Sequence, residues 1–270
     1  MTDTTLTLRV ASATNIGQRR ALNEDAVLAR APVFIVADGM GGHDAGDRAS
    51  SIIVEEMGRL GPSPSVEDVR DALARARWSI DQLDASDLGH AAGSTVSGVV
   101  LVEQAGLPYW LVLNLGDSRT YHITDGVVKQ ISVDHSEVQE LIDTGRLDPP
   151  AARRYSRRNV ITRVLGARTP EQPEYWLIPA QPPERWMICS DGLTNELDDD
   201  RIGEILTGDG CPQTAVDALV SAALAAGGRD NISVAIVDAS GPDLSWDDPT
   251  IEEIDILGAT TEPGLVGGAL

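Results

Sequence analysis

Three aspartates follow apolar runs that have the length of buried strands. Asp38 ends FIVAD, Asp117 ends WLVLNLGD and Asp191 ends RWMICSD, and each is followed by Gly or Ser. A buried strand normally ends in a turn, so a carboxylate at that point lies at the mouth of the strand and is well placed for chemistry. A single Asp of this kind is more often a turn residue than a ligand. Its recurrence at three strands indicates that the carboxylates gather at one end of the fold.

The stretch 33–43, VFIVADGMGGH, joins one of these strands to a glycine-rich turn. Glycine lets the backbone approach an ion or a phosphate closely, and it allows positive φ. The competing interpretation is an ordinary Gly-rich turn in which Asp38 has no chemical role.

Two further acidic sites lie beside asparagines: Glu24 with Asp25, and Asp230. Like charges that meet at one place repel strongly unless cations neutralise them. Carboxylates, a backbone carbonyl and water form a hard-oxygen site suited to Mg²⁺ or Mn²⁺. No His–Cys cluster indicates zinc, and the four histidines are scattered along the chain.

The composition is that of an acidic chain with enough apolar residues for a sizeable core. It has 270 residues, 42% of them hydrophobic, and a formal net charge of −21. This charge disfavours binding to nucleic acid or to an anionic membrane and is compatible with gathering divalent cations, although solubility alone also explains an acidic excess. The two cysteines have no metal-type spacing. Neither a signal-peptide pattern nor an apolar stretch of about 20 residues is present, so we expect a soluble, cytoplasmic protein, monomeric by default.

Periodicity divides the chain into strands and helices. Strands are expected at 4–12, 24–29, 33–37, 93–103, 108–114, 119–123, 127–131, 174–178, 185–190 and 231–237. Helices are expected at 45–60, 65–83, 137–145 and 212–226. Strands in two groups, each followed by helices, predict an α+β sandwich of two antiparallel sheets with helices outside. Residues 1–240 are predicted to form one domain, and the acidic segment 241–270 a flexible tail.

The order and wording of these pieces resemble the metal-dependent serine/threonine protein phosphatases of the PP2C (PPM) family, in their bacterial form. The resemblance runs from about residue 7 to about residue 238. It rests on GQRRALNEDA, VADGMGGH, GSTV, LNLGDSR, VDHS, RNVITRVLGA, CSDGL and GGRDNISV, in family order. It implies a four-layer α-β-β-α sandwich and a PP2C-like phosphatase domain that hydrolyses phosphoserine and phosphothreonine on proteins, opposing serine/threonine kinases.

The resemblance also implies a core site of two Mn²⁺ or Mg²⁺ ions. By position, Asp38 bridges the two ions, Asp191 and Asp230 hold the first, and the carbonyl of Gly39 serves the second.

The remaining site residues surround this core. The resemblance implies that Glu24 and Asp25 support the second ion directly or through water, and that Asp117 belongs to a looser third metal site that bacterial members often show. Arg20 falls where the family places its phosphate-binding arginine.

The chemistry implied for this site needs no covalent intermediate. Two metal ions lower the pKa of a bridging water, which attacks the phosphorus in line, and they stabilise charge on the oxygens. The guanidinium of Arg20 holds two phosphate oxygens in a fork, so Arg20 and Asp38 are the expected catalytic residues. The leaving-group acid stays unassigned, because Met40 stands where eukaryotic relatives have His, and a loop-packing role is equally open for His43.

Residues 147–168, called the flap below, correspond to the family's mobile segment beside the active site. They are rich in arginine, including Arg157 and Arg158, which we interpret as binding phosphopeptides; a solvated loop is the alternative. Tyr155 and Ser156 stand where bacterial members often carry His-Pro, which leaves the substrate preference open.

Two other functions fit the same sequence. One is a catalytically silent regulator that binds phosphoproteins, although silent members usually lose the metal carboxylates, and Asp38, Asp191 and Asp230 are all present. The other is a phosphatase dedicated to one phosphoserine regulator in a partner-switching pathway.

Overall fold

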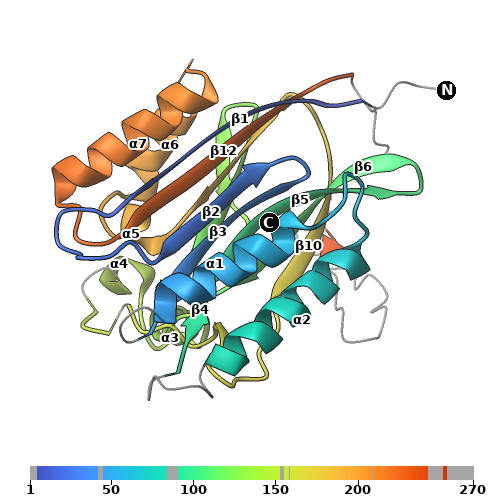
Figure 1. Ribbon diagram of the computed structural model, residues 1–270. Helices are drawn as coiled ribbons and strands as arrows, with labels where there is room; N and C mark the ends of the chain where they lie inside the picture. Colours follow the sequence, from blue (N-terminus) through green and yellow to red (C-terminus); the bar gives the residue numbers. More distant parts are fainter. Residues whose placement is uncertain are drawn as a thin grey trace.

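The first sheet has five antiparallel strands. The computed structural model describes residues 5–41, 45–83, 91–152, 155–157, 159–208, 210–242 and 252–253 (Figure 1). In spatial order the strands are β1 (Thr7–Asn15), β12 (Ile232–Ser240), β11 (Glu184–Cys189), β7 (Arg119–Thr124) and β8 (Val127–Gln130). This sheet therefore brings the two ends of the domain together, because β1 and β12 pair along their whole length.

The second sheet is also antiparallel and has eight strands, seven of them on its main path. Their order is β13 (Glu252–Glu253), β10 (Glu174–Pro179), β6 (Leu107–Leu115), β5 (Val96–Gln104), β3 (Val33–Met40), β4 (Gly93–Ser94) and β9 (Leu165–Gly166), with β2 (Asp25–Arg30) paired to β3. The strand that carries Asp38 thus lies inside the sheet. Its first part pairs with β2 and β5, and its last residues pair with β4.

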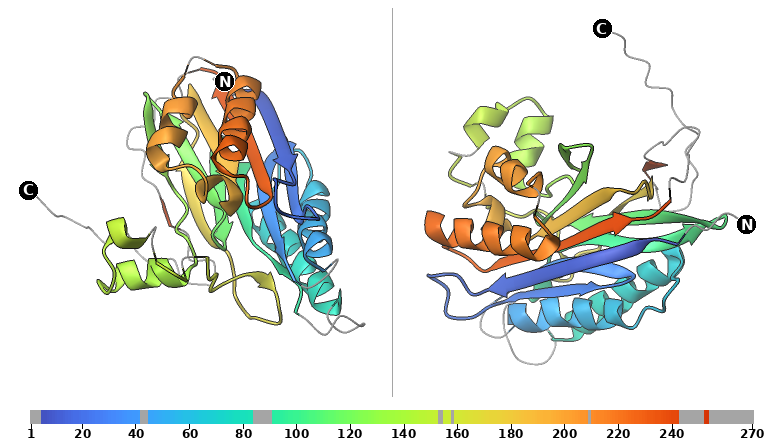
Figure 2. Two further views of the ribbon diagram at one scale, coloured as in Figure 1. Left: turned by 90° about the vertical axis from the view of Figure 1, so that its left-hand side faces the viewer. Right: turned by 90° about the horizontal axis from the view of Figure 1, so that it is seen from above.

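Helices cover the outer face of each sheet. Helices α1 (Ala45–Gly58) and α2 (Val66–Leu83) pack on the second sheet, and α6 (Asp199–Leu206) and α7 (Pro212–Ala226) cover the first. The view from above shows the layers in turn, with α7 on one side and α1 and α2 on the other (Figure 2). Helices α3 (Glu137–Asp143) and α4 (Pro149–Ala152) stand at one end of the sandwich, near β4 (Figure 1).

Alternation along the strands separates the core into three layers. In β3, Phe34 and Val36 pack between the sheets, whereas Ile35 packs toward α1 and α2, because successive strand side chains point to opposite faces. The layer between the sheets contains Trp110 and Trp186, whose ring centroids lie 5.9 Å apart. The predicted α+β fold, a four-layer α-β-β-α sandwich, is confirmed.

Several short elements were not predicted. Helix α6 buries only Ile202 and Leu206, too few apolar positions for a helical period to stand out. Its N-cap is Asp198, whose side chain accepts the N–H of Arg201. The flap contains α4 and β9, of four and two residues. Strand β1 begins at Thr7 and ends at Asn15, three residues later at both ends than predicted.

The predicted tail, 241–270, lies mostly outside the described residues. Its described part includes Glu252–Glu253, which form β13 and pair with Trp176 and Leu177 of β10. The flexibility of the remaining segment stays a prediction.

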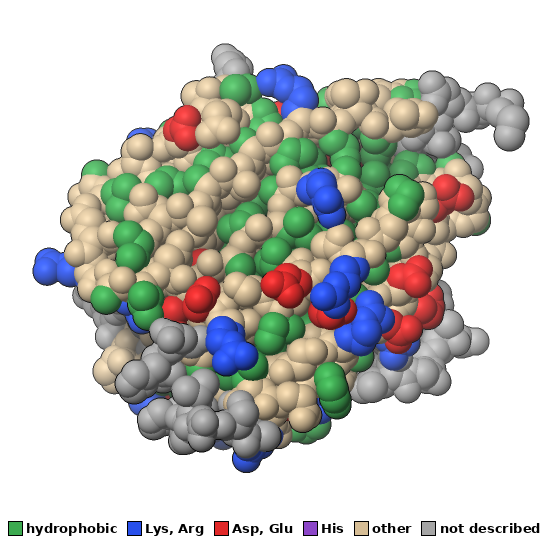
Figure 3. Space-filling view, viewed as in Figure 1, with side chains coloured by type: hydrophobic (Ala, Val, Ile, Leu, Met, Phe, Trp, Pro, Cys, Tyr) green, Lys and Arg blue, Asp and Glu red, His purple; other side chains and the backbone are tan. Residues whose placement is uncertain are grey.

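Charges of both signs are interspersed over α1 and α2 (Figure 3). Here the buried carboxylate of Glu56 pairs with both Arg59 and Arg75. The acidic excess of the chain therefore does not produce a single-sign patch on this face. No helix in the described part of the chain is long and apolar enough to cross a membrane.

Candidate active site

Asp38 lies near the end of β3, where the strand leaves β5 and meets β4. Its backbone carbonyl accepts a hydrogen bond of 3.0 Å from the Ser94 hydroxyl. The following residue, Gly39, donates its N–H to the carbonyl of Glu24 at 3.1 Å. The sequence GSTV therefore holds Asp38 on one side, and the loop before β2 holds Gly39 on the other.

Asp191 and Asp230 come from the other sheet, after β11 and before β12. Their two loops touch at Gly192, where an added Cβ would lie 1.9 Å from the carbonyl oxygen of Asn231, so only glycine permits this approach. The amide of Asn195 donates to Asp191 Oδ2 at 2.9 Å, and the N–H of Asn231 donates to Asp230 Oδ1 at 2.8 Å.

Asp25 connects the two sheets. It lies opposite Asp38 in the pairing of β2 with β3 and is only 8% exposed. The hydroxyl of Ser190, at the end of β11, donates to Asp25 Oδ2 at 2.8 Å. Its neighbour Glu24 is held by the side chain of Asn231, whose oxygen accepts the Glu24 N–H at 2.9 Å. The predicted carboxylates of both sheets therefore meet at one end of the sandwich.

Burial and mutual repulsion make these carboxyl groups hard to ionise together. Burial, followed by the charges of Asp25 and Asp191, raises the pKa of Asp38 well above its usual range. Burial also raises the pKa of Asp25 to about 6, against hydrogen bonds from two serines. The pKa of Asp191 rises to about 6 through burial and the charge of Asp230, while a hydrogen bond with the Asp38 carboxyl opposes the rise. Without a cation, the negative charges of Asp38 and Asp191 thus oppose each other's ionisation.

The donor set fits divalent cations that prefer oxygen. Oδ1 of Asp25 and Oδ1 of Asp117 are buried atoms that have no hydrogen-bond partner within the described residues. Unpartnered buried carboxylate oxygens are costly, and a metal ion would satisfy them. No three His, Cys, Asp or Glu side chains of the described segments already surround one metal position. Asp230, one of the predicted metal ligands, forms an ion pair with Arg20.

Arg20 stands at the rim with about half of its side chain exposed. Its Nε lies 2.8 Å from Asp230 Oδ1 and its Nη2 donates to Oδ2 at 2.8 Å, while Nη1 is 3.9 Å from Glu24. The hydrogen bond with Asp230 is the main reason why the pKa of Arg20 is raised. This fork leaves the Nη1–Nη2 edge of the guanidinium for a second, anionic partner.

Asp117 lies in the turn between β6 and β7, and it is 7% exposed. Burial and the charge of Asp191 raise its pKa well above its usual range. Asp117 and Asp191 line a cavity of about 460 Å³, whose apolar wall includes Val138, Ile142 and Leu197. This cavity separates the α3–α4 region from α5 (Asp191–Thr194) and α6.

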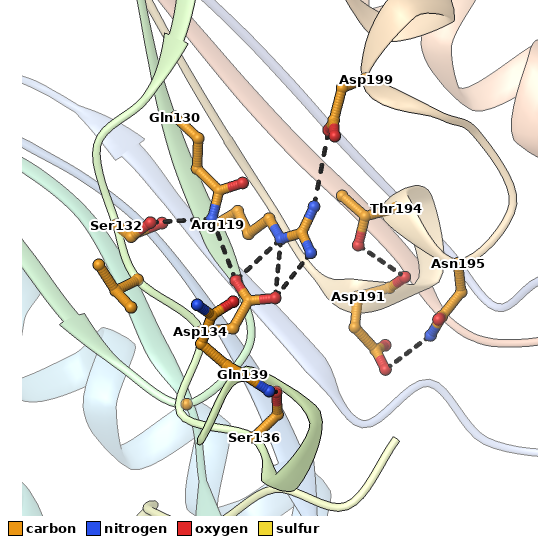
Figure 4. A network of polar contacts seen from close by, with 12 residues as sticks. Arg119, Gln130, Ser132, Asp134, Ser136, Gln139, Asp191, Thr194, Asn195 and Asp199 are labelled. Carbon is orange, nitrogen blue, oxygen red and sulfur yellow. Dashed lines mark hydrogen bonds and ion pairs between the residues drawn. The ribbon is translucent and has the colours of Figure 1, made fainter. Parts of the chain in front are cut away.

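Ion pairs occupy the cationic groups of this cavity, and Figure 4 shows those of Arg119. The guanidinium of Arg119 binds Asp134 through Nε and Nη2, at 2.6 to 3.1 Å, and approaches Asp199 to 3.6 Å. Arg229 pairs with Glu196 at 2.9 Å. The cavity therefore offers a neutralised rim and an apolar wall beside two carboxylates.

The flap residues predicted to bind substrate are only partly described. Arg157 is exposed and pairs with Glu137 of α3 at 2.7 Å. Arg158 and His43 lie outside the described residues, so their predicted roles stay predictions. Arg163 pairs with Glu174 at 3.0 Å. Arg157 and Arg163 of the flap thus face acidic neighbours. The binding of phosphopeptides by flap arginines stays a prediction.

Four polar residues position the carboxylates and were not assigned a role from the sequence: Thr95, Ser190, Asn195 and Asn231. Asn231 also donates through Nδ2 to the carbonyls of Ile16 and Leu22, so it fixes the loop that carries Arg20. All four lie within or close to the motifs quoted above. Ser190 and Asn231 each stand next to a motif aspartate, which is the sequence signal that could have identified them.

The fold and the donor set together define a helix-flanked β-sandwich with a hard-oxygen cation site and a rim arginine. The chain belongs to the protein phosphatase 2C family, whose profile matches residues 17–213.

Relatives and solved structures agree with this assignment. The serine/threonine protein phosphatase PstP of Mycobacterium tuberculosis is 34% identical over 258 residues, which are 93% of this chain and 49% of PstP, so the chain spans about half of that relative. The protein phosphatase PhpP of Streptococcus pneumoniae is 30% identical over 87% of this chain and 99% of its own. A crystal structure of the M. tuberculosis phosphatase superposes with a TM-score of 0.80 at 31% identity, covering 87% of this chain and 99% of that one.

A second structure, the catalytic domain of PstP, is in complex with two manganese ions. It has a TM-score of 0.79 and 30% identity, and covers 88% of this chain and all of its own.

Proposed function

We propose that the chain hydrolyses phosphoserine and phosphothreonine esters on proteins, with Mn²⁺ or Mg²⁺ as cofactor, and opposes serine/threonine kinases. One observation carries the proposal: Asp38, Asp191 and Asp230 meet at the end of the sandwich beside a rim arginine whose side chain is about half exposed. Family membership and the phosphatase relatives support the same reaction.

The carboxylates would hold the cations in two groups. Asp38 would serve both core ions, with Asp191 and Asp230 on the first and the Gly39 carbonyl on the second. When bound, such ions supply an activated water nucleophile and charge stabilisation for phosphoryl transfer. The chain itself contributes a fixed set of oxygens, because Ser190, Asn195 and Asn231 hold the carboxylates and the loops that carry them.

Three further carboxylates would support the bound cations. Glu24 and Asp25 would support the second ion, and Asp117 would bind a third. The unpartnered Oδ1 atoms of Asp25 and Asp117 support these two assignments.

Arg20 would bind the substrate phosphate while it stays anchored. Its Nε–Nη2 edge is engaged by Asp230, and its Nη1–Nη2 edge can form a fork with two phosphate oxygens. The carboxylate thus fixes the plane of the guanidinium before substrate arrives. A lysine at this position has neither the fork nor the fixed plane.

The substrate chain would pass over the cavity beside Asp117. The ion pairs of Arg119 and Arg229 leave no free cation among the described lining residues, so this region suits the neutral or apolar part of a phosphopeptide. The phosphate itself would be bound at Arg20 and the metal site.

The experiment that tests the function measures hydrolysis of p-nitrophenyl phosphate and of a phosphothreonine peptide, with Mn²⁺, with Mg²⁺ and with EDTA. Asp38→Asn and Asp191→Asn keep the shape of each side chain and remove its charge. Metal-dependent turnover that both variants lose establishes the phosphatase. A folded wild-type chain that binds Mn²⁺ without turnover refutes the proposal and identifies a phosphoprotein-binding regulator.

A further inference from the structure

The buried imidazole of His135 lies outside the chemistry proposed above. The residue is 5% exposed and lies between the Asp117 turn and β10. Its Nδ1 accepts the N–H of Gly116 at 3.1 Å, and its Nε2 lies 3.1 Å from Glu174 Oε1. The ring therefore connects the residue before Asp117 to the beginning of β10.

These two contacts determine which ring nitrogen carries the proton. The N–H of Gly116 can only donate, so Nδ1 has to be unprotonated, and Nε2 carries the hydrogen that it donates to Glu174. Arg163 Nη1 lies 3.5 Å from the same Nε2, but it also donates to Glu174 Oε1 at 3.0 Å. His135 Nε2 and Arg163 Nη1 thus both donate to Glu174 Oε1, and this shared acceptor explains why the two nitrogens lie close together.

The carboxylate of Glu174 is suited to receive both. Its pKa is lowered, first by the hydrogen bond with His135 and further by the charge of Arg163, against the effect of burial. It is therefore ionised near neutral pH, and it holds the ring in the required tautomer.

The peptide group of Gly116 is fixed on its other side as well. Its carbonyl accepts the backbone N–H of His135 at 2.9 Å and the amide of Asn114 at 3.2 Å. Its φ is +111°, and an added Cβ would lie 2.5 Å from Thr95 Cγ2. The turn consequently has one conformation, and Asp117 follows directly with its buried Oδ1 unpartnered.

His135 also contacts the flap through its backbone. Its carbonyl accepts the N–H of Thr162 at 2.9 Å, and the next residue, Ser136, forms a β-bridge with Ile161. The hydroxyl of Ser136 caps α3, the helix that leads into the flap. The Asp117 turn and both sides of the flap therefore meet at His135.

We propose that His135 is a positioning residue for the Asp117 metal site: its ring clamps the Gly116 peptide against Glu174 and so holds the Asp117 carboxylate in its ligating orientation. The proposal rests on the proposed function, because it assigns Asp117 to a third cation. If the imidazole merely filled space, replacement of His135 by Asn or by Gln would have the same effect. If the clamp depends on Nδ1, the two replacements have different effects.

The decisive variants are His135→Asn and His135→Gln. The Asn oxygen takes the place of Nδ1 and keeps an acceptor for Gly116, whereas the Gln amide takes the place of Nε2 and keeps only the donor to Glu174. Glu174→Ala removes the acceptor of the His135 Nε2–H. Because Glu174 is partly exposed, we expect this variant to fold. Glu171→Ala is its matched control, because Glu171 lies 3.9 Å from Arg163 and has no contact with the ring among the described interactions.

Three readouts are independent of catalysis. Amide hydrogen exchange of Gly116 in the metal-free protein reports the clamp, and ¹⁵N NMR of the His135 ring reports its tautomer. Calorimetric titration with Mn²⁺, compared with Asp117→Asn, reports the weakest site. We expect His135→Gln and Glu174→Ala to weaken that site by about 10–100-fold and to accelerate Gly116 exchange, with the core sites unchanged. His135→Asn and Glu171→Ala should stay close to wild type.

The proposal is overturned if the ring is protonated at Nδ1, or if the Asn and Gln variants bind Mn²⁺ and exchange Gly116 equally. Failure of the proposed function has a different signature. In that case the wild-type chain lacks turnover or binds no Mn²⁺ at Asp38 and Asp191, while the Gly116 exchange and the ring tautomer still report the clamp.

Discussion

Asp38 and Thr95 bind each other reciprocally across the β3–β4 junction. The N–H of Asp38 donates to Thr95 Oγ1 at 3.0 Å, and the N–H of Thr95 donates to the Asp38 carbonyl at 2.9 Å. The same hydroxyl is hydrogen-bonded to Ser118 Oγ at 2.8 Å. A single buried hydroxyl thus links the strand that carries Asp38 to the turn that carries Asp117.

Thr95→Val removes this hydroxyl without changing the side-chain shape. It leaves the Asp38 N–H without its acceptor, so we expect a loss of about 1–3 kcal/mol in the free energy of unfolding and weaker binding of Mn²⁺. Thr95→Ser keeps the hydroxyl and serves as control. Denaturant unfolding and Mn²⁺ titration measure both effects. Equal stability of the Val and Ser variants contradicts the prediction.

Arg20→Lys tests the anchored fork. Lysine keeps the charge, but its single ammonium group has no two donor edges with which to bind Asp230 and phosphate at the same time. Loss of one charge-assisted hydrogen bond is worth about 1.5–3 kcal/mol, so kcat/KM for p-nitrophenyl phosphate should fall roughly 10–150-fold. Arg19→Lys, at the exposed neighbouring position, should be neutral. Steady-state kinetics of the two variants decide the matter, and matching losses rule out a specific role for Arg20.

The stability of the metal-free protein should fall as the pH rises. The pKa of Asp25 and that of Asp191 are about 6 in the folded state, above the ordinary value of an unfolded chain. The folded state therefore binds more protons, and its advantage is complete below about pH 4 and lost as the pH rises through about 6. Each carboxyl contributes on the order of 1–3 kcal/mol.

Thermal unfolding in EDTA between pH 4.5 and 7.5 measures this slope. Asp191→Asn removes one of the charges, so it should flatten the slope and raise the metal-free melting temperature at pH 7.5, although it impairs the site. Saturating Mn²⁺ should reverse the trend in the wild type, because the ion binds only the folded state. A metal-free protein that becomes more stable from pH 5 to pH 7 refutes the assigned pKa directions.

Arg157→Ala should raise KM for a phosphopeptide about twofold to fivefold, because an exposed charge contributes little. Turnover of p-nitrophenyl phosphate should stay unchanged. Glu137→Gln releases Arg157 from its 2.7 Å ion pair and should lower the phosphopeptide KM. Arg201→Ala removes an exposed, paired arginine from α6 and is the matched control. Equal effects of Arg157→Ala on both substrates eliminate a role for this flap residue in binding peptide.

Local patterns were sufficient to predict most elements and the carboxylates at their ends. The run before Asp38 and the one before Asp191 form buried strands, and both aspartates lie at the same end of the sandwich. These signals are local, since strand length, burial and turn residues lie within about ten positions of each other.

The supporting contacts could not be predicted in this way. Arg20 and Asp230 are 210 positions apart, and Asp25 and Ser190 are 165 apart, so no periodicity links them. His135 is a single buried histidine whose role depends on a peptide group in another turn. Such contacts follow from the registers of two sheets, which the pattern of one chain does not determine.

The carboxylates are divided between the two sheets: Asp25 and Asp38 belong to one, and Asp191 and Asp230 adjoin the other. The distance between these halves is set by the thickness of the apolar layer in which Trp110 packs on Trp186. The packing of that layer therefore controls how far apart the two pairs of carboxylates lie. We expect a substitution that makes the layer thinner or thicker to weaken cation binding, although every ligand residue is unchanged.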